Sequence, residues 1–167
     1  MKKTLTSALE NIITENTLIV CLDDNNFESE IIEQQVSNYL EEFIPSMVVT
    51  EKYFDLDGIL LRLLNDNSTK EILFILPIDF GEKVGNIELI DPKELPNFTS
   101  SRSVTLQVLL EILKQQKKCY ILGIQADVAE INETKRKNTL KFNKAIKELA
   151  EHIRKIITKK LGKKVSM

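Results

Sequence analysis

The sequence of 167 residues contains few cysteines, glycines and histidines, and each shortage excludes a class of site. Its two cysteines, Cys21 and Cys119, are too far apart for a CxxC motif, which argues against a structural zinc site. Five scattered glycines form no phosphate-binding loop. His152 is the only histidine, so a multi-histidine metal site is excluded, and we expect it to be exposed. No serine lies in the GxSxG context of a nucleophile elbow.

Long apolar runs are also missing. No stretch approaches the roughly 20 apolar residues that cross a bilayer, and residues 1–10 lack the apolar core of a signal peptide. A hydrophobic fraction of 43% and a charged fraction of 29% are ordinary for a globular domain and exclude a disordered chain. Both cysteines lie in apolar runs, so we expect them to be buried and reduced. These features predict a cytoplasmic protein with no membrane insertion.

The charge is unevenly distributed along the chain. The net charge is −2, but residues 135–164 carry +10 and the remainder carries −12. A basic face can bind nucleic acid, an anionic membrane or an acidic partner. It is also typical of a solvated helix, because lysine and arginine are good helix formers. Phe142 is the only aromatic residue in this segment, so bases would have nothing to stack on. We therefore favour the solvated helix and expect no nucleic-acid partner.

Apolar patterning predicts alternating strands and helices. Continuous apolar runs at 18–22, 72–76 and 120–124 predict strands covered on both faces, and 47–49 is a further strand candidate. Residues 86–90 alternate in polarity, which is typical of a strand at a sheet edge. Apolar residues at helical spacing predict helices over 7–14, 31–43, 56–64, 104–114 and 139–161. Residues 95–103 read as a loop.

Strands separated by helices require crossover connections, which predict a mostly parallel sheet with helices on both faces. We expect one α/β domain over residues 1–167, because no linker or repeat divides the chain. Residues 1–15 would hold an N-terminal helix and residues 139–161 a closing basic helix. We expect the protein to be a monomer.

Acidic and amide residues follow several of the predicted strands. Asp23 and Asp24 follow the first strand, Asp79 follows the third, and Gln125 and Asp127 follow the strand that ends at residue 124. The carboxyl ends of parallel strands meet at one edge of a sheet, where ligands bind in open α/β folds. Such a cluster could hold a metal or perform acid–base chemistry. Asp is also a preferred residue for ending strands and capping helices, so both interpretations stay open.

Two stretches of the chain resemble one protein family. Residues 79–92 are similar to the "D-x-G … G-x-I-x-I-I-D-P" segment of hydrogenase maturation endopeptidases, in the branch that serves hydrogenase 3-type enzymes. Residues 106–113 and 121–125 are similar to a helix of that family and its "L-G-I-Q-P" strand end, with Ala126 in place of proline. The resemblance extends over most of the chain in element order, from Leu18 to the closing helix.

The resemblance implies a three-layer α/β/α domain with a central, mostly parallel five-stranded sheet. It also implies a partner, the large subunit of a nickel–iron hydrogenase or its precursor. Members of the family remove a C-terminal extension from that subunit after nickel has been inserted. The nickel arrives with the client, so no resident cofactor is expected. The family recognises nickel through an acidic residue after the first strand, an Asp at the end of the third strand and a His before the next long helix.

In this chain the nickel-ligand positions are substituted. The acidic position after the first strand falls on Asp23, Asp24 or Glu28, and the short loop without glycine leaves the register open. The second ligand position falls on Leu76 and the histidine position on Arg102. Leucine has no donor atom, and arginine is a permanent cation without a lone pair, so neither can bind a divalent metal. The resemblance therefore predicts no metal site.

Asp79 matches a further acidic position, three residues after Leu76, which the family does not use for metal. Arg102 could pair with Asp23, Asp24 or Asp79 and supply the charge that a metal would have supplied. We therefore expect an endopeptidase-like protein, a pseudoenzyme with lost or altered nickel-dependent processing.

Two alternatives to this expectation remain. The first is an active endopeptidase with a rearranged site of Asp23, Glu28 and Asp79. The second is a binding module that uses the basic C-terminal helix.

Overall fold

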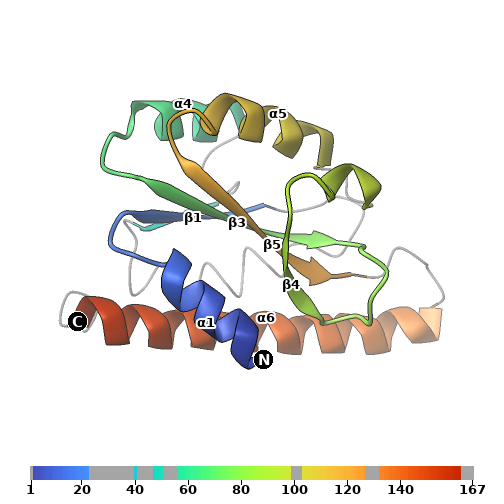
Figure 1. The fold of residues 1–167 in the computed structure, drawn as a ribbon. Coiled ribbons are helices and arrows are strands. Elements are labelled where there is room, and N and C mark those ends of the chain that lie inside the picture. Colours follow the sequence, from blue (N-terminus) through green and yellow to red (C-terminus); the bar gives the residue numbers. More distant parts are fainter. Residues whose placement is uncertain are drawn as a thin grey trace.

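A central sheet of five strands organises the chain (Figure 1). The structure, a computed structural model, describes residues 2–22, 40, 47–50, 56–98, 103–126 and 132–162. In spatial order the strands are β2 (Val48–Thr50), β1 (Thr17–Cys21), β3 (Glu71–Ile78), β5 (Lys118–Gln125) and β4 (Ile87–Ile90). β2, β1, β3 and β5 are parallel, whereas β4 runs antiparallel to β5. The predicted mostly parallel sheet, with an edge strand near residues 86–90, is confirmed.

Helices cover both faces of the sheet (Figure 1). On one face lie α1 (Lys3–Ile12) and α6 (Asn132–Leu161). On the other lie α4 (Leu56–Asn65), α5 (Ser103–Leu113) and a short 3₁₀ helix, η3 (Leu95–Asn97). Among the described helices, none combines the length and the apolar character needed to cross a bilayer. The expected three-layer α/β/α class of fold is confirmed.

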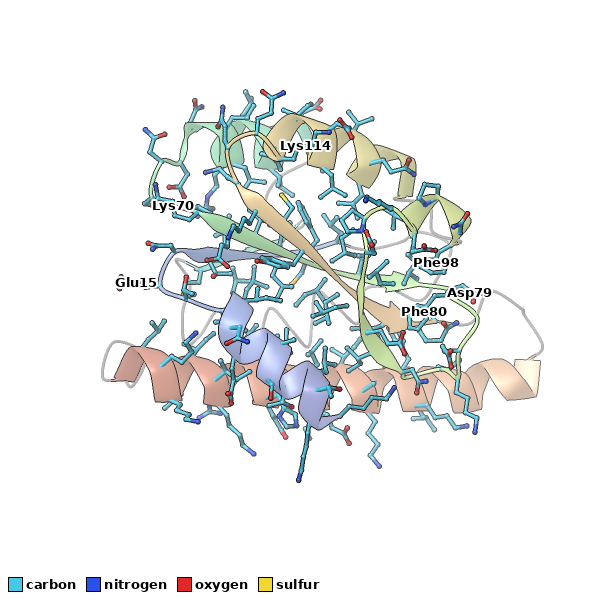
Figure 2. All side chains as sticks on the ribbon, viewed as in Figure 1. Glu15, Lys70, Asp79, Phe80, Phe98 and Lys114 are labelled. Atoms are coloured by element: carbon cyan, nitrogen blue, oxygen red, sulfur yellow. The ribbon has the colours of Figure 1, made fainter. Side chains whose placement is uncertain are left out.

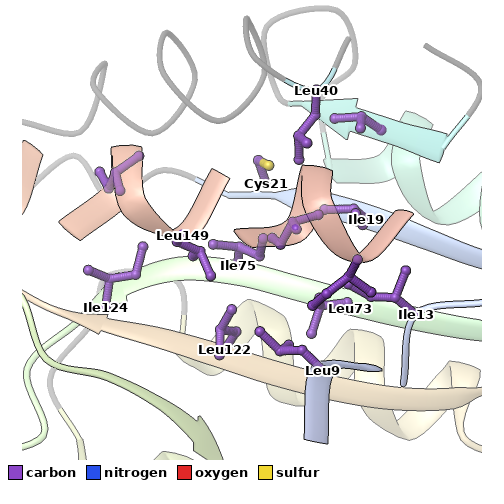
Figure 3. Close-up of a cluster of buried hydrophobic side chains, with 14 of the residues drawn as sticks. Leu9, Ile13, Ile19, Cys21, Leu40, Leu73, Ile75, Leu122, Ile124 and Leu149 are labelled. Atoms are coloured by element: carbon purple, nitrogen blue, oxygen red, sulfur yellow. The ribbon is translucent and has the colours of Figure 1, made fainter. Parts of the chain in front are cut away.

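Alternation along the buried strands divides the core into two clusters, one on each face of the sheet. In the first cluster, Leu9 of α1 and Leu149 of α6 pack with Ile75 of β3 (Figure 3). In the second, Phe74 of β3 packs among side chains of α4 and α5 that include Ile59. Because successive residues of a strand face opposite sides, a strand covered on both faces must be apolar at every position. The unbroken apolar runs in the sequence reflect this requirement.

The largest boundary errors of the sequence analysis concern the first and last helices. α1 begins at Lys3 rather than at residue 7. It ends at Ile12 rather than at residue 14, because the Thr17 hydroxyl donates to the Ile12 carbonyl at 2.8 Å and accepts from the Thr14 amide at 2.9 Å. α6 begins at Asn132 rather than at residue 139. Residues 132–138 have no apolar periodicity and include asparagine and threonine, which are weak helix formers, so the pattern did not reveal these first turns.

Two further predictions concern connecting segments. The predicted loop over 95–103 contains η3, whose Leu95 side chain is fully buried. α5 begins at Ser103, the last residue of that predicted loop. The helix predicted over 31–43 lies outside the described residues except at Leu40, which is helical and buried.

Gly123 is required by close packing between strands. A Cβ at this position would lie 2.7 Å from Cγ2 of Ile78 and 2.8 Å from Cδ1 of Ile90. Both isoleucines are buried, on β3 and β4 respectively, so neither side chain can move away freely. The glycine therefore lets these three strands pack closely at this end of the sheet.

We predict that Gly123→Ala lowers the free energy of unfolding by about 1–3 kcal/mol, because it overpacks the core. Urea denaturation would measure the loss. Ile90→Val removes one of the two contacted methyl groups, so the double variant should lose less stability than the sum of the single variants. Strictly additive losses would contradict this explanation.

At the opposite end of the sheet, polar contacts tie the α4–β3 connection to β5. Lys117 is 7% exposed, and its Nζ donates to the carbonyls of Asp66 and Thr69 at 2.5 and 2.7 Å. The Asp66 carboxylate accepts from the amide and hydroxyl groups of Ser68 and Thr69 at 2.6–3.2 Å. These hydrogen bonds, led by the one from the Ser68 hydroxyl, hold the pKa of Asp66 well below its ordinary value of 3.8.

A lowered pKa in the folded state means that ionised Asp66 stabilises the fold. The contribution is complete above the ordinary value of 3.8 and is lost as the pH falls toward the lowered value. We therefore expect the wild-type protein to lose more stability than Asp66→Asn when the pH falls from about 5 to about 2. Urea denaturation across this range measures the difference, and parallel pH profiles would refute it.

Candidate functional site

The candidate site lies at the carboxyl edge of β3 and β5. These strands pair in register from Glu71 opposite Lys118 to Ile78 opposite Gln125, so they end together. Asp79 follows β3 directly and therefore lies beside the end of β5. Figure 2 shows Asp79 and Phe80 at the end of the sheet away from Lys70, which precedes β3.

Gln125 holds this edge together with both ends of its side-chain amide. Its Oε1 accepts from the backbone amides of Phe80 at 2.9 Å and Glu82 at 3.1 Å. Its Nε2 donates to Oδ1 of Asp79 and to the carbonyl of Ala126, both at 2.9 Å. The side chain is 3% exposed and makes four hydrogen bonds, so it is an anchor for the loop rather than a reagent.

Asp79 is half-buried and is positioned by two hydrogen bonds to one of its oxygens. Oδ1 accepts from Gln125 and from the amide of Gly81 at 3.0 Å. Within the described part of the chain, no hydrogen bond to Oδ2 is present. Gly81 has a positive φ of 82°, a conformation that glycine adopts without strain and that turns the chain back toward β4.

An aromatic pair lies next to this carboxylate. The rings of Phe80 and Phe98 meet edge to face, with centroids 6.1 Å apart and an interplanar angle of 61° (Figure 2). Both rings are half-buried and pack against the second core cluster. They connect the loop after β3 to the segment after η3, so the surroundings of Asp79 are partly apolar.

The position that would supply the second nickel ligand is part of the core. Leu76 is fully buried in the second cluster and pairs with Gly123. It directly follows Ile75, whose carbonyl accepts from the amide of Leu22 at the end of β1. An apolar side chain therefore occupies the junction of β1 and β3, where a metal would need a donor atom. In the described ranges, no group of three or more His, Cys, Asp or Glu side chains could hold a metal ion.

The other candidate residues, Asp23, Asp24, Glu28, Arg102 and Asp127, lie outside the described residues. Asp79 and Gln125 are thus the two predicted site residues that the described structure brings together. The predicted pairing of Arg102 with an acidic residue stays a prediction.

The cysteines and the histidine do not form a second site. Cys21 is fully buried, as expected, whereas Cys119 is half-buried because β5 is still exposed at its first residues. Burial nevertheless raises the pKa of the Cys119 thiol to about 11, and the charge of Lys117 opposes this shift only in part. The thiol is therefore protonated at neutral pH and is a poor nucleophile. His152 is half-buried, not exposed as predicted, because it lies next to the buried side of α6.

The basic helix has a structural role that the sequence did not reveal. One side of α6 is buried in the first core cluster, where it contributes Phe142, Ile146, Ile153 and other residues. Near its end, Nζ of Lys160 donates to the carbonyls of Glu10 and Ile13, at the C-terminal end of α1. Positive charge at the end of α6 therefore caps another helix, which favours the solvated-helix interpretation.

The sheet order, the antiparallel edge strand, and the loop that carries Asp79 at the carboxyl edge define a fold class: this chain has the fold of NiFe hydrogenase maturation proteases. A NiFe hydrogenase maturation protease from Thermococcus kodakarensis superimposes with a TM-score of 0.58 and 18% identity, covering 90% of this chain and 99% of that one. The sequence itself matches no family profile and no curated protein.

Two further solved structures have the same fold. The endopeptidase HycI of Escherichia coli aligns with a TM-score of 0.53 and 15% identity, covering 86% of this chain and 91% of that one. A hydrogenase 3 maturation protease aligns with a TM-score of 0.51 and 16% identity, covering 81% and 87%. The fold expected from the sequence resemblance is therefore confirmed.

We predict that Gln125→Leu lowers the free energy of unfolding by about 2 kcal/mol, because it leaves the amides of Phe80 and Glu82 without their acceptor. Amide hydrogen exchange should accelerate at these two residues. Asp79→Asn is the matched control, since it keeps an oxygen that can accept from Gln125 and should cost less. Equal losses in the two variants would show that Gln125 does not anchor the loop.

Proposed function

We propose that this protein acts in the maturation of a nickel–iron hydrogenase, on the large subunit or its precursor, with nickel-dependent C-terminal processing lost or altered. The fold likeness to three maturation proteases supports the choice of partner. The proposed location is the cytoplasm, where an enzyme precursor would be matured. The proposed action is binding of the client without cleavage of its chain.

The proposed loss of nickel-dependent processing is argued from Leu76. Nickel recognition needs several donor atoms in a fixed geometry. Leu76 supplies none, and it is fully buried among apolar side chains, which would give a water ligand no polar partners. Asp79 is the one candidate carboxylate in the described part of the chain, and its Oδ1 is already engaged by Gln125 and Gly81. We therefore propose no resident metal or cofactor, and nickel would reach this protein only as part of the client.

The experiment is an intact-mass measurement on the nickel-loaded large-subunit precursor after incubation with this protein. We expect the mass of the precursor to be unchanged and the two proteins to co-elute in size-exclusion chromatography. A maturation protease that cleaves the same precursor serves as the positive control. Failure of the two proteins to co-elute would refute the proposed partner.

A loss of mass at the precursor's C-terminus would instead refute the loss of processing. Asp79→Asn would then decide whether Asp79 belongs to a rearranged site, because it removes the carboxylate but keeps the size of the side chain. Glu82→Gln is the matched control, since Glu82 is an exposed acid on the same loop. Cleavage that stops in the first variant and continues in the second would assign the activity to Asp79.

A further inference from the structure

The strand at the edge of the sheet offers main-chain groups that pair with nothing else in the described chain. Among the described strands, β4 is the last of the sheet and pairs only with β5. Its ladder begins where the Gln125 amide donates to the Asn86 carbonyl at 2.8 Å. Along an antiparallel strand, every second residue directs its amide and carbonyl toward the neighbouring strand. Because Asn86 bonds to β5 in this way, Glu88 and Ile90 do so as well. Ile87 and Leu89 therefore direct their amides and carbonyls away from the sheet.

This edge has only part of the protection that natural sheets give to edge strands. Such edges are usually kept short or are blocked by charged side chains, by proline or by a covering segment. β4 is short, with four residues and one charge, but contains neither proline nor lysine. β4 reads Ile-Glu-Leu-Ile, and Pro92 comes only after the strand has ended. The one charge, on Glu88, lies 3.7 Å from Nζ of Lys2 and is partly neutralised by it. Among the described residues, no hydrogen bond is made to the outward main-chain groups of Ile87 or Leu89.

The edge is also continuous with the candidate site. The amide of Gly85, just before β4, donates to the Gln125 carbonyl at 3.1 Å, and residues 79–86 connect β3 to β4 around the end of β5. A strand added outside β4 would lie three strand spacings from β3, about 14 Å. Four or five extended residues cover that distance. One polypeptide segment can therefore pair with β4 and reach Asp79.

We propose that the outer edge of β4 binds an extended segment of the client polypeptide as an additional strand, through the main-chain groups of Ile87 and Leu89. The identity of the client rests on the proposed function, and the segment is the C-terminal part of the large-subunit precursor. A second copy of this chain is a less suitable occupant, because a pairing of two four-residue strands is marginal by itself. A client segment gains further contacts along the loop at 79–86.

A proline substitution can block the edge without breaking the sheet. Leu89→Pro removes an outward amide and leaves the bonds of Glu88 and Ile90 to β5, and edge strands tolerate proline at such positions. Leu89→Ala is the matched control, because it also removes the leucine side chain but keeps the amide. Circular dichroism and urea denaturation would show that both variants are folded.

The probe is a fluorescent 20-residue peptide from the C-terminus of a nickel–iron hydrogenase large-subunit precursor, titrated by anisotropy. We expect Leu89→Pro to weaken binding at least tenfold and Leu89→Ala to weaken it less than threefold. Equal affinities for the two variants would overturn the proposal. A wild-type protein that forms dimers, when Leu89→Pro is monomeric by light scattering, would also overturn it and assign the edge to a second copy.

Amide hydrogen exchange gives a test that needs no variant. Binding of the peptide to the wild-type protein should slow exchange at Ile87 and Leu89 at least tenfold. Exchange at Glu88 and Ile90 should change little, because their amides are already bonded to β5. A complex that leaves Ile87 and Leu89 unprotected would overturn the edge proposal but not the proposed function. A wild-type protein that binds neither the peptide nor the full precursor would overturn both.

Discussion

The in-register pairing of β3 with β5 is the constraint on which the rest of the structure depends. Because the two strands start and end together, their connections are brought side by side at both ends of the sheet. At one end, Lys117 reaches the carbonyls of the α4–β3 connection. At the other end, Gln125 reaches Asp79 and the amides beyond it. A shift of one residue in this register would separate both sets of contacts, so the core pairing and the candidate site are determined together.

The carboxyl edge combines a loop that is fixed by hydrogen bonds with an apolar interior. Gln125 and Gly123 keep the end of β5 close to β3 and β4, and the loop after β3 is fixed by main-chain hydrogen bonds. Leu76, which the sequence resemblance aligns with the second nickel-ligand position, belongs to the hydrophobic core. Among the described residues, this edge offers one candidate carboxylate, Asp79, beside main-chain groups that a polypeptide can recognise. Under the proposed function, the fold would keep its partner while nickel-dependent processing is lost or altered.

The sequence predicted the sheet well because buried strands need unbroken apolar runs, and the alternating polarity of residues 86–90 identified the edge strand. Helix ends were predicted less well. The end of α1 depends on hydrogen bonds of Thr17, which apolar spacing does not reveal. The start of α6 was missed because its first turns have no apolar periodicity. Of the site, Asp79 and Gln125 were predicted to share one edge, but the four hydrogen bonds of Gln125 were not, because they depend on the register of β3 and β5. The buried lysine at the opposite edge was also missed, since nothing in its sequence context distinguishes it from an exposed one.

The capping of α1 by Lys160 has a consequence for the order in which the chain can fold. The carbonyls that end the first helix receive their partner from the end of the last helix, and the first core cluster is closed by α6. During synthesis, β1, β3 and β5 can pair before α6 has left the ribosome, but of the two helices on the first face only α1 is then available to cover it. The nascent chain must therefore carry a partly open hydrophobic surface until α6 emerges. This is the stage at which a chaperone would have most to protect.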